Sequence, residues 1–484
     1  MNPLSDSCAG MPRFYEICRR ILTSHPCAEG SVAVASSPGS ADVMGGIVEE
    51  SGSLVLTTTL ATAINAAAWQ IAGDEVRILF AGVAAPGASH NGDVLSLHLP
   101  LSAFDPAATD SAGVRARCAQ AGADWAVPTC LTIRQAIADR LIPMPSGGLA
   151  IFLQSDFPAE VDLGKHWVQA AASLEAICRL FQVQADPLQK SRVCAEAVLP
   201  LTGLFNLRTP MTALCGPPEG ALLQLLFYPQ AMCQVLELPP GIIIMAAATR
   251  LSRPTTSQRL IETRVCAEMG RCLIAQMQQA DGARIDPAAA RLAAVTPVEY
   301  VERYRDRLPP KMTGQAFMRR FGTLRGLDGE PNPEATYKIR SRAEHHIYEN
   351  RRAHEFATGI ARARRTSSLE SLIHAGELMY ASHWSHSQRC GIGGVEADRL
   401  VSAIRAHGAK AGLFGAKVTA GGQGGELVVL MRDDPRAHDA LAEAVARSER
   451  ASQRPINTFR GPVPGAEVIQ PPEMADALSS GASA

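Results

Sequence analysis

Short apolar runs bounded by Gly- and Ser-rich turns predict strands in the first third of the chain. Residues 31–60 alternate such runs (SVAVA and GSLVL) with turn residues, and Val76–Val83 ends at the breaker stretch AAPGAS. Two further runs, Leu149–Leu153 and Gly241–Ala248, have the length of buried strands. The run from Gly241 to Ala248 is the longest apolar stretch, and it is far too short to cross a bilayer.

Helical periodicity takes over later in the chain. His166–Gln182 carries Ala, Leu, Ile and Phe at helical spacing, which predicts a core helix. Leu369–Trp384, Glu396–His407 and Ala437–Arg450 also have apolar faces, and Gly408 stands where a residue just past a helix end is expected. The second half is therefore predicted to be richer in helices than the first.

The mixed order of strands and helices predicts an α+β fold divided near residue 200. Leu413–Val418 and Glu426–Met431 read as two strands that flank a Gly-rich loop. No internal repeat is visible in the sequence. The predicted organisation is an N-terminal extension (1–30), an N-terminal domain (31–200), a C-terminal domain (201–465) and a flexible tail (466–484) rich in Pro, Gly, Ala and Ser.

Composition narrows the functional class. The chain has 484 residues, of which 46% are hydrophobic and 19% charged, as in an ordinary folded protein of two or three domains. Its 46 basic and 47 acidic residues give a formal net charge of -1. Such a balance provides no general attraction to nucleic acid or to an anionic membrane, so neither is predicted as a partner.

Cysteine usage and the first residues predict the compartment. The opening MNPLSDSCAG lacks the basic and then apolar pattern of a secretory signal. The 12 cysteines include no Cys-x-x-Cys pair, which favours reduced core thiols over a disulfide framework. We therefore expect a cytoplasmic protein.

Two segments resemble the signature motifs of a known kinase family. SSPGSADVMGGIVEESGSLVL (36–56) is similar to the first signature of arabinokinase-like GHMP kinases, and GAKVTAGGQGGELVVLM (415–431) is similar to their C-terminal Gly-rich motif. KMTGQAFMRRFG (311–322), TYKIRSRAEHHIYEN (336–350) and GELMYASHWSHSQRCGIGGVEADRLV (376–401) resemble further stretches of the same branch. Five ordered segments are far more specific than a lone glycine loop.

The resemblance implies a fold and an activity class. It predicts a two-domain GHMP kinase fold, with a ribosomal-protein-S5-domain-2-like N-terminal domain, a ferredoxin-like-type C-terminal domain and a ligand cleft between them. The resembled enzymes belong to the galactokinase and L-arabinokinase group, which phosphorylates the anomeric hydroxyl of a sugar with ATP and magnesium. The implied partners are therefore a sugar or sugar phosphate and, if the protein is active, ATP with magnesium.

Several positions that carry the family's chemistry hold other residue types here. The family's phosphate-binding loop at a helix N-terminus aligns with Asp162–His166, where Gly164 alone suits close backbone approach. Lys165 and His166 are candidate phosphate contacts, with a solvent-facing helix start as an equal alternative. The magnesium-binding Glu of the family aligns with Ala170, whose methyl group cannot replace a metal-binding carboxylate.

The first signature is also altered. The family's Arg after Pro-Gly aligns with Ser40, and its base Asp aligns near Thr209. No catalytic residue is therefore assigned. The resemblance implies that a second group of residues contacts or surrounds the sugar, with Glu49 in place of a sugar-binding Asp: Asp42, Gly45, Gly46 and Glu49.

The C-terminal loop keeps the family's small residues. Its members can turn sharply and present backbone amides to a ligand: Thr419, Gly421, Gly422, Gly424 and Gly425. A glycine-rich hairpin packed against a neighbouring helix is the plain alternative. With the resemblance, we predict a preserved corner of the active site.

Two other patterns have competing interpretations. His383, His386 and Cys390 have spacing that zinc can use, but lining of a sugar pocket is favoured because no fourth ligand is recognisable, and no metal site is predicted. The basic stretch Lys338–Arg365 reads as a solvated helix face with acidic partners rather than a phosphate or nucleic-acid site. Two functions stay open: a sugar-binding pseudokinase, or an active sugar 1-kinase with a rebuilt phosphate site.

Overall fold

The chain divides into two compact units in a computed structural model. The structure describes residues 11–27, 32–82, 94–158, 160–249, 254–322, 330–419, 425–463, 465 and 467–468. The first unit comprises residues 1–40, 59–216 and 463–484, and the second comprises residues 41–58 and 217–462. Strands β1 (Ala33–Met44) and β2 (Val55–Ile71) contribute residues to both units, so residues 41–58 belong with the C-terminal half of the chain.

The first unit is built on one mixed sheet. Its strand order is β14-β1-β2-β5-β3-β4, where β3 is Glu75–Gly82, β4 is Leu95–Pro100, β5 is Gly148–Ser155 and β14 is Glu467–Val468. Strand β5 runs antiparallel to β2 and parallel to β3, whereas β4 and β14 pair antiparallel with β3 and β1. Strand β14 lies within the segment that the sequence predicted to be a tail.

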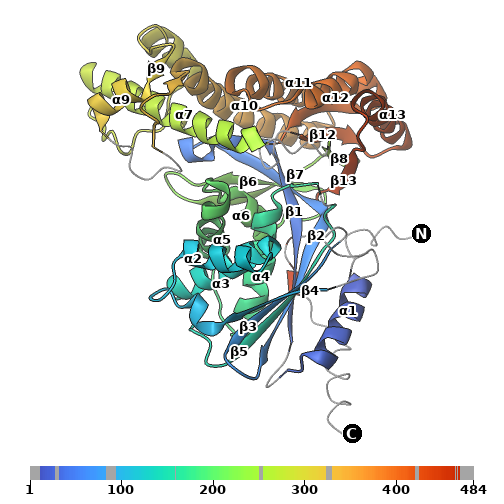
Figure 1. The fold of residues 1–484 in the computed structure, drawn as a ribbon. Helices are drawn as coiled ribbons and strands as arrows, with labels where there is room; N and C mark the ends of the chain where they lie inside the picture. Colours follow the sequence, from blue (N-terminus) through green and yellow to red (C-terminus); the bar gives the residue numbers. More distant parts are fainter. Residues whose placement is uncertain are drawn as a thin grey trace. The chain divides into compact units, whose positions relative to one another are not determined.

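Helices cover both faces of this sheet (Figure 1). Helix α1 (Met11–Ser24) buries Phe14 and Ile17 against Trp69 and Phe152 on one face, so it belongs to the core although it lies in the predicted extension. The other face carries a helical group whose members pack on one another: α2 (Ser111–Gln120), α3 (Val127–Ala138), α4 (Lys165–Leu180), α5 (Pro187–Thr202) and α6 (Arg208–Cys215).

The second unit contains an antiparallel four-stranded sheet of order β11-β12-β8-β13. These strands are β8 (Ile242–Ala248), β11 (Leu413–Val418), β12 (Glu426–Arg432) and β13 (Asn457–Gly461). A hairpin of β6 (Ala221–Leu226) and β7 (Met232–Glu237) pairs with Val55–Thr57 of β2. Strand β9 (Met312–Thr313) pairs with β10 (Thr336–Tyr337).

Long helices complete the second unit, as Figure 1 shows. Helix α10 (Ile339–Thr366) packs on α7 (Pro254–Ala280) and α11 (Leu369–Ser385), and α11 in turn packs on β11. Helices α12 (Val395–His407) and α13 (Pro435–Ser452) share an apolar core with β8, β11 and β12. Short helices of this unit include α8 (Pro297–Glu299), α9 (Gly314–Phe321) and the 3₁₀ helix η1 (Gly46–Ser51).

The predicted secondary structure agrees with these elements. Of the predicted apolar runs, residues 76–82 lie in β3, residues 149–153 lie in β5 and residues 242–248 form β8, while Val83 lies outside the described residues. Gly408 follows α12 with a φ of 62°, a conformation that glycine adopts without strain. None of the helices in the described part of the chain combines the length and apolar character that a membrane crossing requires.

Candidate functional site

A buried ion pair joins the first signature to the C-terminal motif in the second unit. Asp42 on β1 accepts hydrogen bonds from Lys417 Nζ at 2.7 Å and from Thr419 Oγ1 at 2.7 Å. Its backbone N–H also donates to Thr419 Oγ1, at 3.1 Å. The side chains of Asp42 and Lys417 are fully buried. The two motifs that carry the family resemblance are therefore in direct contact.

Lys417 is the last but one residue of β11, and every other residue of this strand is apolar or Gly. A lysine is almost never fully buried without a partner, because removing its charge from water costs far more than packing its methylenes returns. Asp42 and Thr419 provide that partner and use both carboxylate oxygens in doing so. We call these three residues the Asp42 cluster.

A second buried carboxylate, Glu349 on α10, holds the turn of the first signature. Its Oε1 accepts from the Gly45 backbone N–H at 3.3 Å and from Ser382 Oγ at 2.5 Å, and its Oε2 accepts from Arg352 Nε at 2.7 Å. Burial alone would raise the pKa of Glu349, but opposing effects, of which the charge of Arg352 is the largest, lower the pKa to about 2. Glu349 is therefore ionised at neutral pH.

Three histidines are fully buried near these carboxylates. His346 Nδ1 lies 2.6 Å from Ser51 Oγ, and His345 Nδ1 lies 2.8 Å from Ser385 Oγ. The ring centroids of His345 and His386 are 4.5 Å apart. Burial is the main cause that lowers the pKa of His346 to about 3 and of His386 to about 4, and it lowers the pKa of His345 as well. All three rings are neutral at physiological pH.

The other residues predicted to surround the sugar lie in the same unit. Gly45 has a φ of 92°, and a Cβ there would stand 2.6 Å from the Leu54 carbonyl oxygen, so glycine is required at the turn. Gly46 follows with a φ of 54°. Glu49 is buried, with Oε1 3.6 Å from Arg264 Nη2 on α7. Its contact with sugar stays a prediction.

The residues predicted to handle phosphate come together in the first unit. A Cβ at Gly164 would lie 2.6 Å from Thr209 Cγ2 and 3.7 Å from Ser40 Oγ. Gly164 has a φ of 75° and immediately precedes α4. Thr209 Oγ1 accepts a hydrogen bond from Asn206 Nδ2 at 2.9 Å. The positions aligned with the family's arginine, base and phosphate loop are thus neighbours, and they hold two hydroxyls and a glycine.

Helix α4 supplies the remaining members of this group. Lys165 is its first residue, and its backbone N–H donates to the Asp162 backbone oxygen at 2.7 Å. Burial lowers the pKa of Lys165, opposed by the charge of Asp162. His166 follows and is half-buried. Ala170 is fully buried, so its methyl group is in contact with protein on all sides.

Two predictions need separate comment. Gly421, Gly422 and Gly424 of the C-terminal loop lie outside the described residues, so the sharp turn and the ligand contact predicted for them stay predictions. Thr419 directly follows β11, and Gly425 directly precedes β12. In the zinc interpretation, His383 has both nitrogens engaged: Nδ1 accepts from the Val418 N–H at 3.2 Å, and Nε2 lies 3.1 Å from Asp398 Oδ1. Among the described residues, no group of three His, Cys, Asp or Glu side chains has a metal-binding arrangement.

Comparison with known proteins agrees with the motifs and the fold. The chain is 25% identical to L-arabinokinase of Arabidopsis thaliana over 489 residues, a match that covers 90% of this chain and 46% of the relative. It therefore spans about half the length of that protein. No family model matches. Galactokinase of Lactococcus lactis, solved with galactose, superposes with a TM-score of 0.70 at 15% identity, covering 94% of this chain and all of that one.

In fold and in its motifs the chain is similar to kinases of the GHMP superfamily. A mevalonate kinase structure superposes with a TM-score of 0.51 at 12% identity and covers 88% of this chain and 98% of its own. The predicted α+β GHMP fold is confirmed. Among relatives of this superfamily the chain is sugar-kinase-like, since L-arabinokinase and galactokinase are among those it resembles.

Magnesium-bound nucleotide fits the described residues poorly. The family position for a metal-binding carboxylate is the buried methyl of Ala170, and the loop before α4 contacts Thr209 closely at Gly164. A magnesium ion needs oxygen ligands, which a methyl group cannot provide. We therefore assign no phosphoryl-transfer step to these residues.

The sequence prediction missed the partners that hold the signature. Lys417, Glu349 and His346 were not named as site residues, although each left a signal. The single lysine in the apolar run LFGAKV requires a buried group of opposite charge. The segment EHHIYEN carries charged and imidazole side chains on a helix that also has an apolar face. Their partners were not predictable from the sequence, because Asp42 and Lys417 lie 375 residues apart.

Proposed function

We propose that this protein is a GHMP-fold, sugar-kinase-like pseudokinase that binds a sugar or sugar phosphate. The observation that carries the proposal is the grouping of Ser40, Gly164 and Thr209 in the first unit. The fold keeps the phosphate-handling positions adjacent, yet none of the three has a charged side chain. The scaffold is retained and its reactive groups are replaced.

Phosphoryl transfer depends on charge placed around the transferred group. Its transition state spreads negative charge over the phosphoryl oxygens, and catalysis comes almost entirely from positioning and from cationic or metal stabilisation. A serine at position 40 supplies no positive charge, and Thr209 is no general base at neutral pH because its hydroxyl is a very weak base. The fully buried Ala170 removes the metal ligand as well.

The sugar-binding half of the proposal rests on the second unit. Lys417 binds Asp42 of the first signature, and Glu349 binds the Gly45 N–H of the same segment. Glu49 keeps a carboxylate at the position where the resembled kinases use an Asp toward the sugar. A rigid, buried support is what a binding residue requires to hold its geometry. The residue types needed for phosphoryl transfer are replaced, whereas the buried groups that support the first signature are present. This combination favours a binding protein over a chain that has lost both catalysis and binding.

An active ATP-dependent sugar 1-kinase is the second candidate. Lys165 favours it, since a lysine in the first turn of the 16-residue helix α4 adds positive charge to an N-terminus that already attracts anions. In this candidate Lys165 or His166 contacts phosphate in place of the family's loop.

Turnover and binding measured together separate the two candidates. ADP release is followed with ATP, magnesium and a panel of pentoses and hexoses, and the same ligands are titrated calorimetrically. The pseudokinase proposal expects saturable sugar or sugar-phosphate binding without turnover in the common enzyme range of about 1–1000 per second. Turnover in that range that is lost in Lys165→Met and kept in Lys190→Met would establish the kinase candidate instead.

A further inference from the structure

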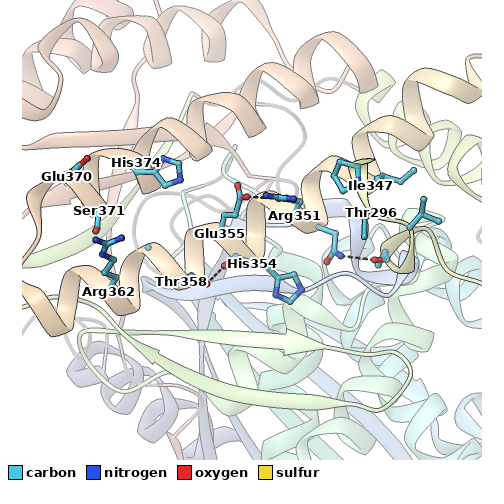
Figure 2. A pocket seen from close by; sticks show the side chains of 15 residues that line it. Thr296, Ile347, Arg351, His354, Glu355, Thr358, Arg362, Glu370, Ser371 and His374 are labelled. Carbon is cyan, nitrogen blue, oxygen red and sulfur yellow. Dashed lines mark hydrogen bonds and ion pairs between the residues drawn. The ribbon is translucent and has the colours of Figure 1, made fainter. Parts of the chain in front are cut away.

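A cavity in the second unit lies along α10, apart from the Asp42 cluster. Its volume is about 720 Å³, within the range of small-molecule sites. The walls are α10 from Ile347 to Arg362, the start of α11 from Glu370 to His374, and the segment from Ala293 to Pro297. Figure 2 shows these side chains from close by. Neither the first signature nor the C-terminal motif lines it.

The polar groups of the cavity are arranged in a row. His354, Thr358 and Arg362 are spaced four residues apart on α10, so they lie on one face of the helix. Over 8 residues this row extends about 12 Å along the helix axis. Figure 2 shows the Arg362 side chain directed toward Ser371 of α11.

The charges in the cavity are mostly balanced. Arg351 Nε and Glu355 Oε1 are 2.6 Å apart and neutralise each other. Arg362 has no ion-pair or hydrogen-bond partner for its side chain among the described residues, and the same holds for His374. One cation, Arg362, and one anion, Glu370, are therefore left to interact with a ligand.

The charged and polar side chains of the cavity indicate the class of ligand that fits it. One unpaired guanidinium suits a single phosphate group, which it can contact through two parallel N–H donors. Di- and triphosphates would meet Glu370 without a second free cation. The described residues that line the cavity include no Phe, Tyr or Trp, so a nucleobase finds no stacking surface. Imidazole, hydroxyl and carboxylate groups together match a ligand rich in hydroxyls.

We propose that this cavity is a second ligand site that takes a monosaccharide monophosphate. Arg362 binds the phosphate, and His374, Ser371 and Glu370 hydrogen-bond the sugar hydroxyls. The site is separate from the one in the proposed function and needs no catalysis there. Since a sugar phosphate is the product type of a sugar kinase, such a site lets the protein respond to that product.

Calorimetric titration of the full chain tests the proposal. The probes are galactose 1-phosphate and glucose 6-phosphate, with galactose, inorganic phosphate and ATP as comparisons. Arg362→Gln is expected to weaken sugar-phosphate binding about tenfold or more, because a charge-assisted hydrogen-bonded pair is lost. Arg365→Gln is the matched control: it lies on the same helix, is exposed and does not line the cavity, so binding should change less than about twofold.

Four outcomes overturn the proposal. They are the absence of saturable binding by both sugar phosphates, equal weakening by the two arginine variants, inorganic phosphate binding as tightly as the sugar phosphates, and binding that Glu49→Gln abolishes while Arg362→Gln leaves it intact. The last outcome assigns the ligand to the first signature, which keeps the proposed function and removes the second site. Thermal melts of each variant without ligand establish that it is folded.

Discussion

The two groups of residues that align with the family motifs differ in the charges they carry. In the second unit, Asp42 keeps its carboxylate and meets Lys417 in a fully buried ion pair. In the first unit, Ser40 and Thr209 stand beside Gly164 with no charge among them. Ser40 and Asp42 are only two residues apart on β1, so the difference does not follow chain position.

The contrast separates charges that support the fold from charges that serve chemistry. Removing one partner of a buried pair leaves an uncompensated charge, which typically costs about 3–5 kcal/mol, so Asp42 and Lys417 are constrained by stability alone. A catalytic arginine or aspartate at the edge of a site pays no such penalty when replaced by a small neutral residue. The charges of Asp42 and Lys417 are therefore ones whose individual loss is expected to destabilise the fold.

The largest effect should come from breaking the buried pair. Lys417→Met leaves Asp42 without its cation, and we expect the free energy of unfolding to fall by about 3–5 kcal/mol in chemical denaturation. Lys410→Met, at an exposed position close by in the sequence, is the control and should change stability by less than about 0.5 kcal/mol. Similar small losses in both variants would show that Asp42 does not depend on Lys417.

Substitution of Gly164 tests the packing of the residues that lie together in the first unit. Gly164→Ala forces a Cβ to within 2.6 Å of Thr209 at a φ of 75°. We expect a loss of about 2–3 kcal/mol, from backbone strain plus the clash. Gly241→Ala is the matched control, since its φ of 71° is similar and nothing lies within 4 Å of the added Cβ. The difference between the two melts isolates the contact with Thr209, and equal losses would argue against that contact.

Glu349 should matter through its charge rather than its shape. Glu349→Gln keeps the volume but weakens the hydrogen bonds to Gly45 and Arg352, so we expect about 1.5–3 kcal/mol of lost stability. Glu355→Gln on the same helix breaks a solvent-exposed pair with Arg351 and should cost less than about 1 kcal/mol. Sugar binding that weakens in Glu349→Gln alone would tie the support of the first signature to ligand binding.

The histidines give the smallest and most graded effect, a dependence on pH. Their pKa values are lower in the folded chain than in the unfolded one, so the unfolded state binds more protons below pH 6.5 and stability falls as the pH drops toward about 4. Between pH 7 and 6 each buried ring should cost roughly 0.7 kcal/mol. Below about pH 4.5, protonation of Glu349 adds a further loss because its folded pKa is also depressed.

Denaturation curves at several pH values test this expectation. His346→Asn keeps a polar group beside Ser51 and removes one titrating ring, so its stability should fall less steeply between pH 7 and 6 than that of the parent. His407→Asn, outside the buried group, should leave the slope unchanged. An identical slope in all three proteins would mean that His346 titrates normally.

The residue pattern alone determined the local structure and the family resemblance. Apolar runs such as Gly241–Ala248 and helical faces such as Glu396–His407 follow from periods of two and 3.6 residues, which depend on near neighbours in the chain. The motif order predicted the GHMP fold, and the residue types at Ser40, Ala170 and Thr209 predicted missing charges. These inferences required no knowledge of which distant residues touch.

Contacts across long separations were decided only by the tertiary structure. Asp42 and Lys417, Ser51 and His346, or Gly45 and Glu349 lie hundreds of residues apart, so nothing in the local pattern pairs them. Whether a histidine is neutral or a lysine is paired depends on burial and on charges brought in by folding. The cavity on α10 also depends on contacts between distant segments. Helical periodicity places His354, Thr358 and Arg362 on one face of α10, but the cavity forms only because α11 and the segment from Ala293 to Pro297 pack beside that face.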